Sequence, residues 1–203
     1  MVKKKNAITL DERKQIQLEM LIEIDKFCRE HNIKYMLAYG TLIGAVRHKG
    51  YIPWDDDVDV AMLSSEYEKF LKVCPPNLSV ERMYQTTSLE PTSLYIHDKI
   101  RLKGTFFSTK YSDQFLMENG VYIDVFIYYK TSDNIKKQER HIRQIHIMRR
   151  LLGMRWVNYP RSNIHYNLSR IALPFMRLFS TKTFKKWYEK LICKYEKKNT
   201  NSL

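Results

Sequence analysis

Residues 38–59 read AYGTLIGAVRHKGYIPWDDDVD. Near the start of this stretch, a Gly40-Thr41 step precedes a short apolar run, which predicts that a helix begins there. At its end, polar and apolar residues alternate with the period of a β-strand, so Asp57 and Asp59 are expected to lie on one face of that strand. The stretch therefore predicts a helix N-terminus that is followed shortly by a strand with paired carboxylates.

Outside this stretch, hydrophobic periodicity predicts further helices and strands. Thr9 and Glu12 have the spacing of a capping box, which marks the start of a helix. Ser65 and Glu68 have the same spacing before another helix, which we expect to stop ahead of Pro75–Pro76 because proline lacks the N–H that continues a helix. Helices are predicted at about 10–30, 133–155, 163–179 and 181–198, and strands at about 33–38, 79–86, 94–102 and 121–128.

The segment Trp54–Asp59 places four carboxylates in five positions. Two unit charges about 4 Å apart repel by about 4 kcal/mol at an effective dielectric constant of about 20. A proton, an arginine or a divalent cation can offset such repulsion, and hard carboxylate oxygens favour Mg²⁺ or Mn²⁺. Asp57 and Asp59 are therefore candidate metal ligands, whereas Asp55 and Asp56 fit a solvated turn equally well.

Asp124 is a third candidate. It is an isolated acid on the polar side of the predicted strand 121–128, whose other side is apolar. It could contribute a third carboxylate to a metal site. It could also be an ordinary strand-end carboxylate that local hydrogen bonds satisfy, and the residues alone leave both interpretations open.

Four residues of the predicted short helix are candidates for binding phosphate. Gly40 and Thr41 would offer backbone N–H groups and a hydroxyl at a helix N-terminus, where an anion is favoured. Arg47 and His48 follow on the same helix, and an arginine there can contact phosphate through two hydrogen bonds. For His48, a packed or surface imidazole is the alternative.

Lys99 and Arg101 lie two residues apart in the predicted strand 94–102 and therefore share one face of it. They could contact phosphate or a leaving group, and the alternative is a pair of surface charges on an edge strand. Trp54 precedes the acidic run. We expect its ring to pack beneath the loop that carries the carboxylates rather than to stack on a ligand.

Three segments of the chain resemble the LicD family: residues 38–59, GVYIDVF at 120–126 and, more weakly, KIRLKGT at 99–105. That family contains bacterial phosphorylcholine transferases, with fukutin and the fukutin-related protein as distant relatives. The resemblance covers about residues 12–130 and implies an α+β, nucleotidyltransferase-like fold with a mixed β-sheet flanked by helices. A basic helical C-terminal segment would follow it. Family members usually continue into a further aromatic-rich segment, which we do not find in this sequence.

The resemblance also implies roles for particular residues. Asp57 and Asp59 match the metal-binding pair, and Asp124 matches the third carboxylate. Gly40 and Thr41 match the turn that contacts phosphate. The implied reaction transfers a phospho-alcohol group from a CDP-activated donor such as CDP-choline to a hydroxyl of a cell-surface glycan (teichoic acid, lipopolysaccharide or capsule). Mg²⁺ or Mn²⁺ would be the cofactor and CMP the leaving group, and Asp124 would hold a second metal ion or accept the acceptor's proton.

The chain has 203 residues and a formal net charge of +13, which is unevenly distributed. Residues 1–130 hold 18 basic and 18 acidic residues, whereas residues 131–203 hold 17 basic and 4 acidic ones. We therefore expect a catalytic core over 1–130 and a basic amphipathic helical segment over 131–203 that packs on it. Basic helices with interleaved aromatics suit an anionic membrane surface or an ordinary helical layer, and no nucleic-acid-binding motif accompanies them.

The location and the rival functions follow from the same features. Three cysteines without a CxxC pair, and an N-terminus without an apolar signal region, suggest a cytoplasmic protein. A peripheral position on the inner membrane face would bring it to a lipid-linked glycan acceptor. The alternatives are a DxD-type glycosyltransferase that uses a nucleotide sugar, a nucleotidyltransferase that releases pyrophosphate, and a non-catalytic, truncated membrane-associated relative.

Overall fold

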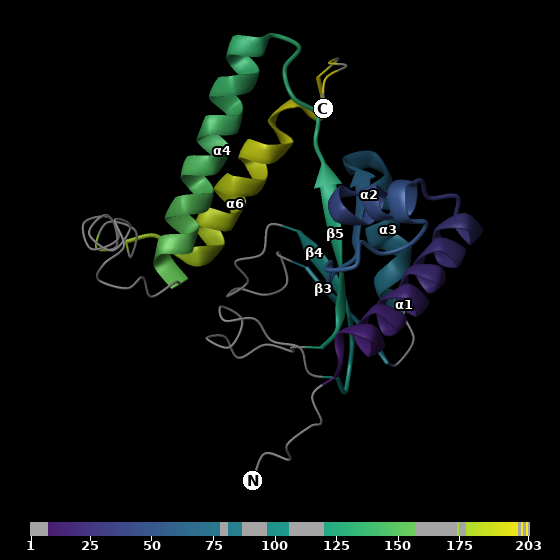
Figure 1. Cartoon of the computed structure of the whole chain (residues 1–203). Coiled ribbons are helices and arrows are strands. Elements are labelled where there is room, and N and C mark those ends of the chain that lie inside the picture. Colours follow the sequence, from purple (N-terminus) through teal and green to yellow (C-terminus); the bar gives the residue numbers. More distant parts are fainter. Residues whose placement is uncertain are drawn as a thin grey trace. The chain divides into compact units, whose positions relative to one another are not determined.

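The computed structural model describes residues 8–77, 81–86, 97–105, 120–156, 174, 178–198, 200 and 202. Its elements are α1 (Leu10–Glu30), β1 (Met36–Leu37), α2 (Tyr39–His48), β2 (Asp59–Leu63), α3 (Ser64–Asn77), β3 (Arg82–Gln85), β4 (Asp98–Leu102), β5 (Tyr122–Tyr128), α4 (Ile135–Trp156), α6 (Thr181–Ile192) and the 3-10 turn η2 (Cys193–Tyr195). The elements from α1 to β5 belong to one compact unit, and α4, α6 and η2 belong to a second (Figure 1). The predicted division at residues 130 and 131 stays a prediction.

Five strands form one mixed sheet in the order β1-β2-β5-β4-β3. β2 and β5 run parallel, and every other neighbouring pair is antiparallel. The register places Asp59 of β2 beside Asp124 of β5, and Asp124 beside Lys99 of β4. A mixed sheet flanked by helices confirms the predicted α+β fold.

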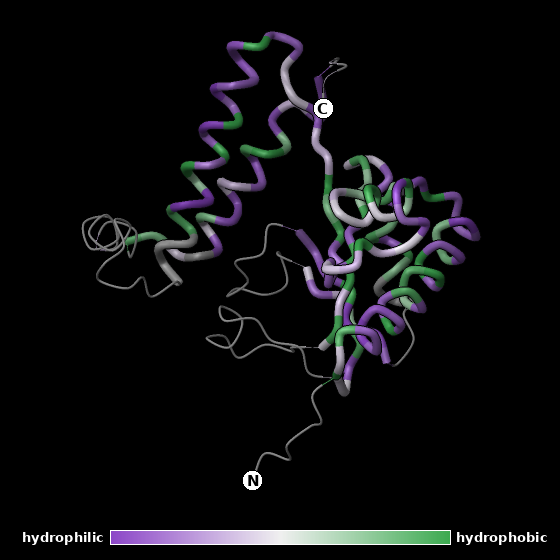
Figure 2. The backbone as a smooth tube through the Cα atoms, in the orientation of Figure 1, coloured by the Kyte–Doolittle hydropathy of each residue, from purple (hydrophilic) through white to green (hydrophobic). Residues whose placement is uncertain are grey.

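One face of the sheet is apolar and packs against α1 and α3 (Figure 1). Val60, Ile100 and Ile123 project from neighbouring strands into this core. Met20 of α1 and Phe70 of α3 pack against them, and all five side chains are at most 1% exposed. Figure 2 shows the hydrophobic residues of β5 along this layer. Because strand side chains alternate, the polar residues of the same strands project from the opposite face.

α1 begins where the sequence predicts. The Thr9 hydroxyl accepts a hydrogen bond from the Glu12 N–H at 3.2 Å, and the Glu12 carboxylate accepts one from the Thr9 N–H at 2.8 Å, so the capping box is confirmed. Gln17 is buried further along the helix. Its Nε2 donates to the backbone carbonyls of Asp56 at 3.3 Å and Tyr122 at 3.1 Å. These bonds tie α1 to the acidic loop and to β5.

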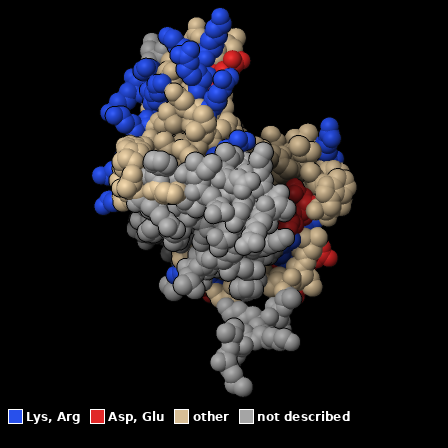
Figure 3. Space-filling model, turned by 90° about the vertical axis from the view of Figure 1, so that its left-hand side faces the viewer, with Lys and Arg blue, Asp and Glu red and all other residues tan. Residues whose placement is uncertain are grey.

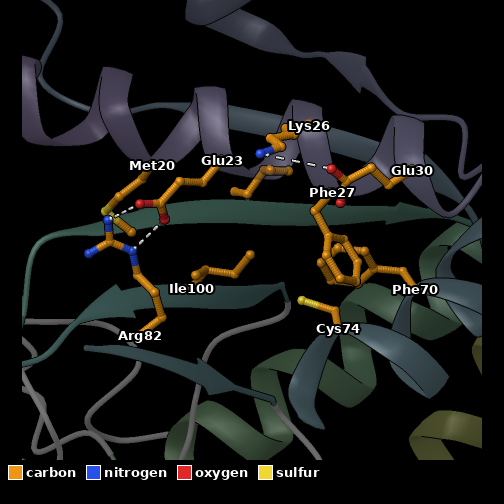
Figure 4. Close-up of a pocket in the computed structure, with 10 residues that line it drawn as sticks. Met20, Glu23, Lys26, Phe27, Glu30, Phe70, Cys74, Arg82 and Ile100 are labelled. Atoms are coloured by element: carbon orange, nitrogen blue, oxygen red, sulfur yellow. Dashed lines mark hydrogen bonds and ion pairs between the residues drawn. The ribbon is translucent and has the colours of Figure 1, made fainter. Parts of the chain in front are cut away.

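A pocket of about 270 Å³ lies between α1, α3 and the strands β3 and β4 on the helix-covered face (Figure 4). Phe27, Phe70 and Ile100 form part of its mainly apolar lining. At its rim, the Arg82 guanidinium pairs with the Glu23 carboxylate at 2.9 Å. None of the predicted site residues lines this pocket, because those on the strands project from the other face of the sheet.

Several predicted elements differ from the observed ones. α3 spans Ser64–Asn77 and so continues through Pro75–Pro76, contrary to the prediction. The prolines fall in its last turn, where their missing N–H groups remove hydrogen bonds only at the end of the helix.

The predicted strand 33–38 is reduced to β1, an edge strand with two paired residues, and the predicted helix 181–198 gives way to η2 after Ile192. The predicted helix 163–179 lies almost entirely outside the described residues.

The second unit is built on α4 and α6. The Nε2 atom of His141 on α4 lies 2.7 Å from the Leu191 carbonyl oxygen on α6, and the His141 ring contacts that of Tyr195 at a centroid distance of 5.0 Å. Hydrophilic residues prevail along α4 (Figure 2), and Figure 3 shows Lys and Arg gathered on this part of the surface. Within the described residues, no helix combines the length and the apolarity needed to cross a bilayer.

Gly44 of α2 packs closely against the backbone of the turn that follows the helix. A Cβ on Gly44 would lie 2.5 Å from the Gly50 carbonyl oxygen and 3.1 Å from the Ile52 nitrogen. We expect Gly44→Ala to lower the free energy of unfolding by about 1–3 kcal/mol, because backbone atoms of the adjoining turn must move. Urea unfolding measures the change. Gly50→Ala is the matched control, since a Cβ there meets nothing within 4 Å, and equal stability of the two variants would contradict this packing.

Candidate active site

The three predicted carboxylates converge on the polar face of the sheet. Asp59 begins β2, Asp124 lies beside it in β5, and Asp57 stands in the loop that leads into β2. One ligand atom from each residue lies within 4.8 Å of the others. Asp59 and Asp124 are buried and Asp57 is half-buried, so three negative charges are crowded where little water can screen them.

This crowding changes the acidity of two of the carboxyl groups. Burial, and then the charges of Asp57 and Asp124, raise the pKa of Asp59 to about 7. Burial, and then the neighbouring Asp55 and Asp56, raise the pKa of Asp57 to about 6. The described side chains therefore compensate these two negative charges only in part, which is the condition that a bound cation relieves.

Asp124 differs because two nitrogen-bearing side chains contact it. Its Oδ1 forms an ion pair with Nζ of Lys99 and lies 3.2 Å from Nε2 of His97. Burial by itself would raise the pKa of Asp124, but the close approach of the His97 ring nitrogen and the charge of Lys99 bring it below its ordinary value. Asp124 is therefore held as an anion, with one oxygen fixed by both partners.

Lys99 is buried in β4, with a side chain that is only 3% exposed. Its ammonium lies 3.5 Å from the ring centroid of Tyr122 on β5. Burial lowers the pKa of Lys99 to about 8, while the neighbouring Asp124 opposes that shift, so the ammonium is charged at neutral pH. The ammonium is turned to Asp124, and the predicted contact of Lys99 with phosphate stays a prediction.

The alternative interpretation of Lys99 and Arg101 as surface charges on an edge strand is wrong. β4 lies between β5 and β3, and both side chains are buried. Arg101 donates from Nε to Oε1 of Gln85 at 2.6 Å and from Nη1 to the Gly120 carbonyl at 2.9 Å. These contacts fix its guanidinium against the polar face of the sheet, and its predicted role toward substrate stays a prediction.

The N-terminus of α2 is joined to the carboxylates. The Thr41 hydroxyl accepts a hydrogen bond from the Asp59 N–H at 2.9 Å. A Cβ on Gly40 would lie 2.4 Å from Oδ2 of Asp55, so glycine allows the acidic loop to approach this closely. Tyr39, the residue before it, has a φ of 45°, in the left-handed region that residues with side chains rarely adopt. The predicted phosphate-binding turn therefore lies beside the carboxylates.

Arg47 and His48 lie at the other end of α2. They occupy its last turn and are exposed. At about 1.5 Å of rise per residue, Arg47 lies roughly 9 Å along the helix axis from Thr41. The structure thus separates them from the carboxylates, and their predicted contacts with phosphate stay predictions.

The acidic loop is supported from α1 rather than by its own tryptophan. Trp54 is 80% exposed, so the expectation that it packs beneath the loop is wrong. Instead, Nζ of Lys14 donates to the Pro53 carbonyl at 2.8 Å, and the Gln17 amide reaches the backbone from the same helix. Asp56 is exposed and pairs with Arg13 at 3.0 Å, in keeping with a solvated turn.

His97 is a site residue that local sequence patterns do not single out. It stands just before β4, contacts Asp124 and stacks against Phe126 at a ring centroid distance of 4.5 Å. The available signal was its spacing from Lys99, because residues two apart on a strand share a face. That signal carries weight only once the strand is known to lie beside Asp124.

The chemistry of the donor set fits a hard divalent cation. In the part of the chain that the structure describes, both clusters of side chains able to hold a metal ion consist of aspartates alone. Carboxylate oxygens are preferred by Mg²⁺ and Mn²⁺, whereas zinc more often takes cysteine and histidine. Asp57 and Asp59, with their raised pKa values, would gain most from the ion.

The chain is similar to several known proteins. The family model described as LicD/FKTN/FKRP, nucleotidyltransferase domain, matches residues 32–180. A lipopolysaccharide cholinephosphotransferase LicD from Haemophilus influenzae is 48% identical over 66 residues, which are 32% of this chain and 25% of that protein. Two uncharacterized proteins, from Rickettsia typhi and Rickettsia prowazekii, are each 28% identical over 121 and 114 residues, or 56% and 51% of this chain. The matched regions cover 39% and 43% of those proteins, so the chain spans less than half of each relative.

The raised carboxyl pKa values generate a prediction about stability. Without metal, the folded protein binds more protons at Asp57 and Asp59 than the unfolded chain does, so its stability should fall as the pH rises from about 5 to about 8. Asp59→Asn removes one buried charge and should raise the melting temperature in EDTA at about pH 8 by about 3–6 °C. Asp11→Asn, in the exposed first turn of α1, is the control. If Asp59→Asn leaves the melting temperature unchanged, the predicted repulsion among the three carboxylates is contradicted.

Proposed function

The chain belongs to the LicD/FKTN/FKRP family of nucleotidyltransferase domains, and we propose that it is a metal-dependent phosphotransferase. It would move a phosphocholine-like group from a CDP-activated alcohol to a hydroxyl of a cell-surface glycan. The observation that carries this proposal is the convergence of Asp57, Asp59 and Asp124 beside the N-terminus of α2. Phosphoryl transfer depends on positioning and on neutralising charge around phosphorus, and this arrangement suits both requirements.

The three carboxylates would hold the metal ion. Asp57 and Asp59 would be its main ligands, because their negative charges are the least compensated. When bound, Mg²⁺ or Mn²⁺ supplies positive charge to the donor's phosphates and to the departing CMP. Asp124 would stand in a fixed orientation beside them, since Lys99 and His97 both contact its Oδ1.

The first turn of α2 would orient the donor. Its free backbone N–H groups and the positive end of the helix dipole favour a phosphate oxygen at that place. The Thr41 oxygen already accepts a hydrogen bond from Asp59, so its hydroxyl hydrogen is available to donate to such an oxygen. Gly40 keeps this turn close enough to the acidic loop for one donor to meet both.

The reaction that we propose is a single displacement at phosphorus. The acceptor's hydroxyl oxygen forms a bond to the phosphorus that carries the alcohol. The bond between that phosphorus and the bridging oxygen breaks, and CMP leaves with the electron pair. The acceptor's proton passes to a base or to water. The products are CMP and a glycan that carries the phospho-alcohol group.

The substrates are proposed from the relatives and from the charge of the chain. The Haemophilus influenzae relative is named a lipopolysaccharide cholinephosphotransferase, which supports phosphocholine as the transferred group and a surface glycan as the acceptor. Teichoic acid and capsule are alternative acceptors. A cytoplasmic location at the inner membrane face, next to a lipid-linked acceptor, is supported by the exposed basic residues of the second unit. On α4 and α6 these are Lys136, Lys137, Arg140, Arg143, Arg149, Arg150, Lys182, Lys186 and Lys190.

A donor screen tests this function. CDP-choline, CDP-ribitol, CDP-glycerol and a UDP-sugar are each incubated with the protein and Mg²⁺, and the released nucleotide is identified by chromatography. We expect CMP from CDP-choline or another CDP-alcohol. Asp57→Asn and Asp59→Asn should each lower CMP release by about 100-fold or more, because each removes a charged ligand of the ion.

The controls separate the rival functions. Asp11→Asn, in the exposed first turn of α1, should keep wild-type turnover. Near wild-type turnover of Asp57→Asn or Asp59→Asn would contradict the metal role of that residue. Cleavage of the UDP-sugar in place of the CDP-alcohols would favour a glycosyltransferase, and release of pyrophosphate from CTP would favour a nucleotidyltransferase.

A further inference from the structure

A row of charged side chains crosses the polar face of the sheet. Asp59, Asp124 and Lys99 occupy matching register positions on three neighbouring strands, β2, β5 and β4. Asp124 therefore has the Asp59 carboxylate on one side and the Lys99 ammonium on the other. Two negative charges and one positive charge follow one another across adjacent strands.

The Lys99 ammonium is held in this place from several directions. It forms an ion pair with Oδ1 of Asp124, and it lies 3.5 Å from the ring centroid of Tyr122, where a cation is attracted by the ring face. Its side chain is 3% exposed, so water has little access to the ammonium and cannot readily replace these contacts. His97 approaches the same Asp124 oxygen at 3.2 Å. This cation is thus a fixed part of the site.

The charges around the carboxylates are distributed unevenly. On the loop side, Asp55 and Asp56 adjoin Asp57, and the ligand atoms of these three residues also lie within 4.8 Å of one another. The exposed Asp56 pairs there with one cation, Arg13, at 3.0 Å. On the strand side, Lys99 contacts Asp124, and the Arg101 guanidinium faces the same Tyr122 ring at 4.9 Å. A divalent cation is therefore attracted toward the loop side and repelled from the strand side.

We propose that Lys99 acts as a built-in cation in the place where a second metal ion would sit, so that the site takes a single divalent ion on the side of Asp57 and Asp59. This inference rests on the proposed metal dependence. It makes Lys99 a charge-balancing residue for Asp124 rather than a contact for phosphate. An additional ion on the far side of Asp124 would displace the ammonium or face its repulsion at close range.

Counting bound ions tests the proposal directly. The full chain is titrated with Mn²⁺, alone and with CDP, and the ions bound per chain are counted by calorimetry and by the electron paramagnetic resonance of free Mn²⁺. The wild type should bind one ion in both conditions. Lys99→Met removes the charge and leaves an unbranched side chain that is one atom shorter. It should bind a second ion, or hold the first about tenfold more tightly or better.

Matched variants separate charge from folding. Lys99→Arg keeps the positive charge and should bind one ion with wild-type affinity. Lys26→Met removes an exposed lysine of α1 that lies 3.9 Å from Glu30, and it should leave the count and the affinity unchanged. If Lys99→Met does not fold, the double variant Lys99→Met with Asp124→Asn removes the pair together and should bind one ion, and the wild-type count stands by itself.

Each outcome decides the proposal. Two ions on the wild type would overturn it, as would the same count and affinity for Lys99→Met and Lys99→Arg. No bound ion would overturn it together with the proposed metal dependence. A protein that binds one Mn²⁺ but cleaves no CDP-alcohol would overturn the proposed reaction and leave the role of Lys99 supported.

Discussion

The pairing of Asp59 with Asp124 is the constraint on which the rest of the site depends. The two carboxylates are register partners in the parallel pair β2 and β5, at positions where strands usually gain stability from compatible neighbours. One residue later the same strands place Val60 beside Val125, and both are fully buried in the core. The sheet therefore joins a favourable apolar pair to an unfavourable charged one. The ion pair of Asp124 with Lys99 offsets part of the repulsion, and the remainder favours a bound cation.

The helices around this pair hold the carboxylate-bearing segments in place. α1 and α3 cover the apolar face of the sheet, which leaves the other face for polar side chains. The Gln17 amide reaches the backbone of both the acidic loop and β5, so one side chain couples the two segments that carry the carboxylates. Gly40 lets α2 lie close to the acidic loop, and Gly44 lets it lie close to the turn at the end of the helix. The helix N-terminus consequently lies beside the carboxylates.

The capping box of α1 and the paired carboxylates are visible in the sequence, because each depends on residues that are close together in the chain. A capping box needs residues three apart, as in Thr9 and Glu12, and a strand face needs residues two apart, as in Asp57 and Asp59. Local patterns predicted the ends of helices and strands less accurately. α3 continues through Pro75–Pro76, since a proline in the last turn costs few hydrogen bonds. β1 has only two paired residues and lies at the edge of the sheet.

The α+β character, the acidic loop and the resemblance to a family that the matching family model confirms could all be predicted from the chain's residues. The position of β4 inside the sheet, the burial of Lys99 against Asp124 and the contact of His97 with Asp124 are visible only in the folded protein. The tertiary structure also decided that Trp54 faces solvent and that Arg47 and His48 lie away from the carboxylates. The physical reason is strand pairing over long chain distances. Periodicity states which face of a strand a residue occupies, whereas the neighbour of that strand is set by how the whole sheet packs.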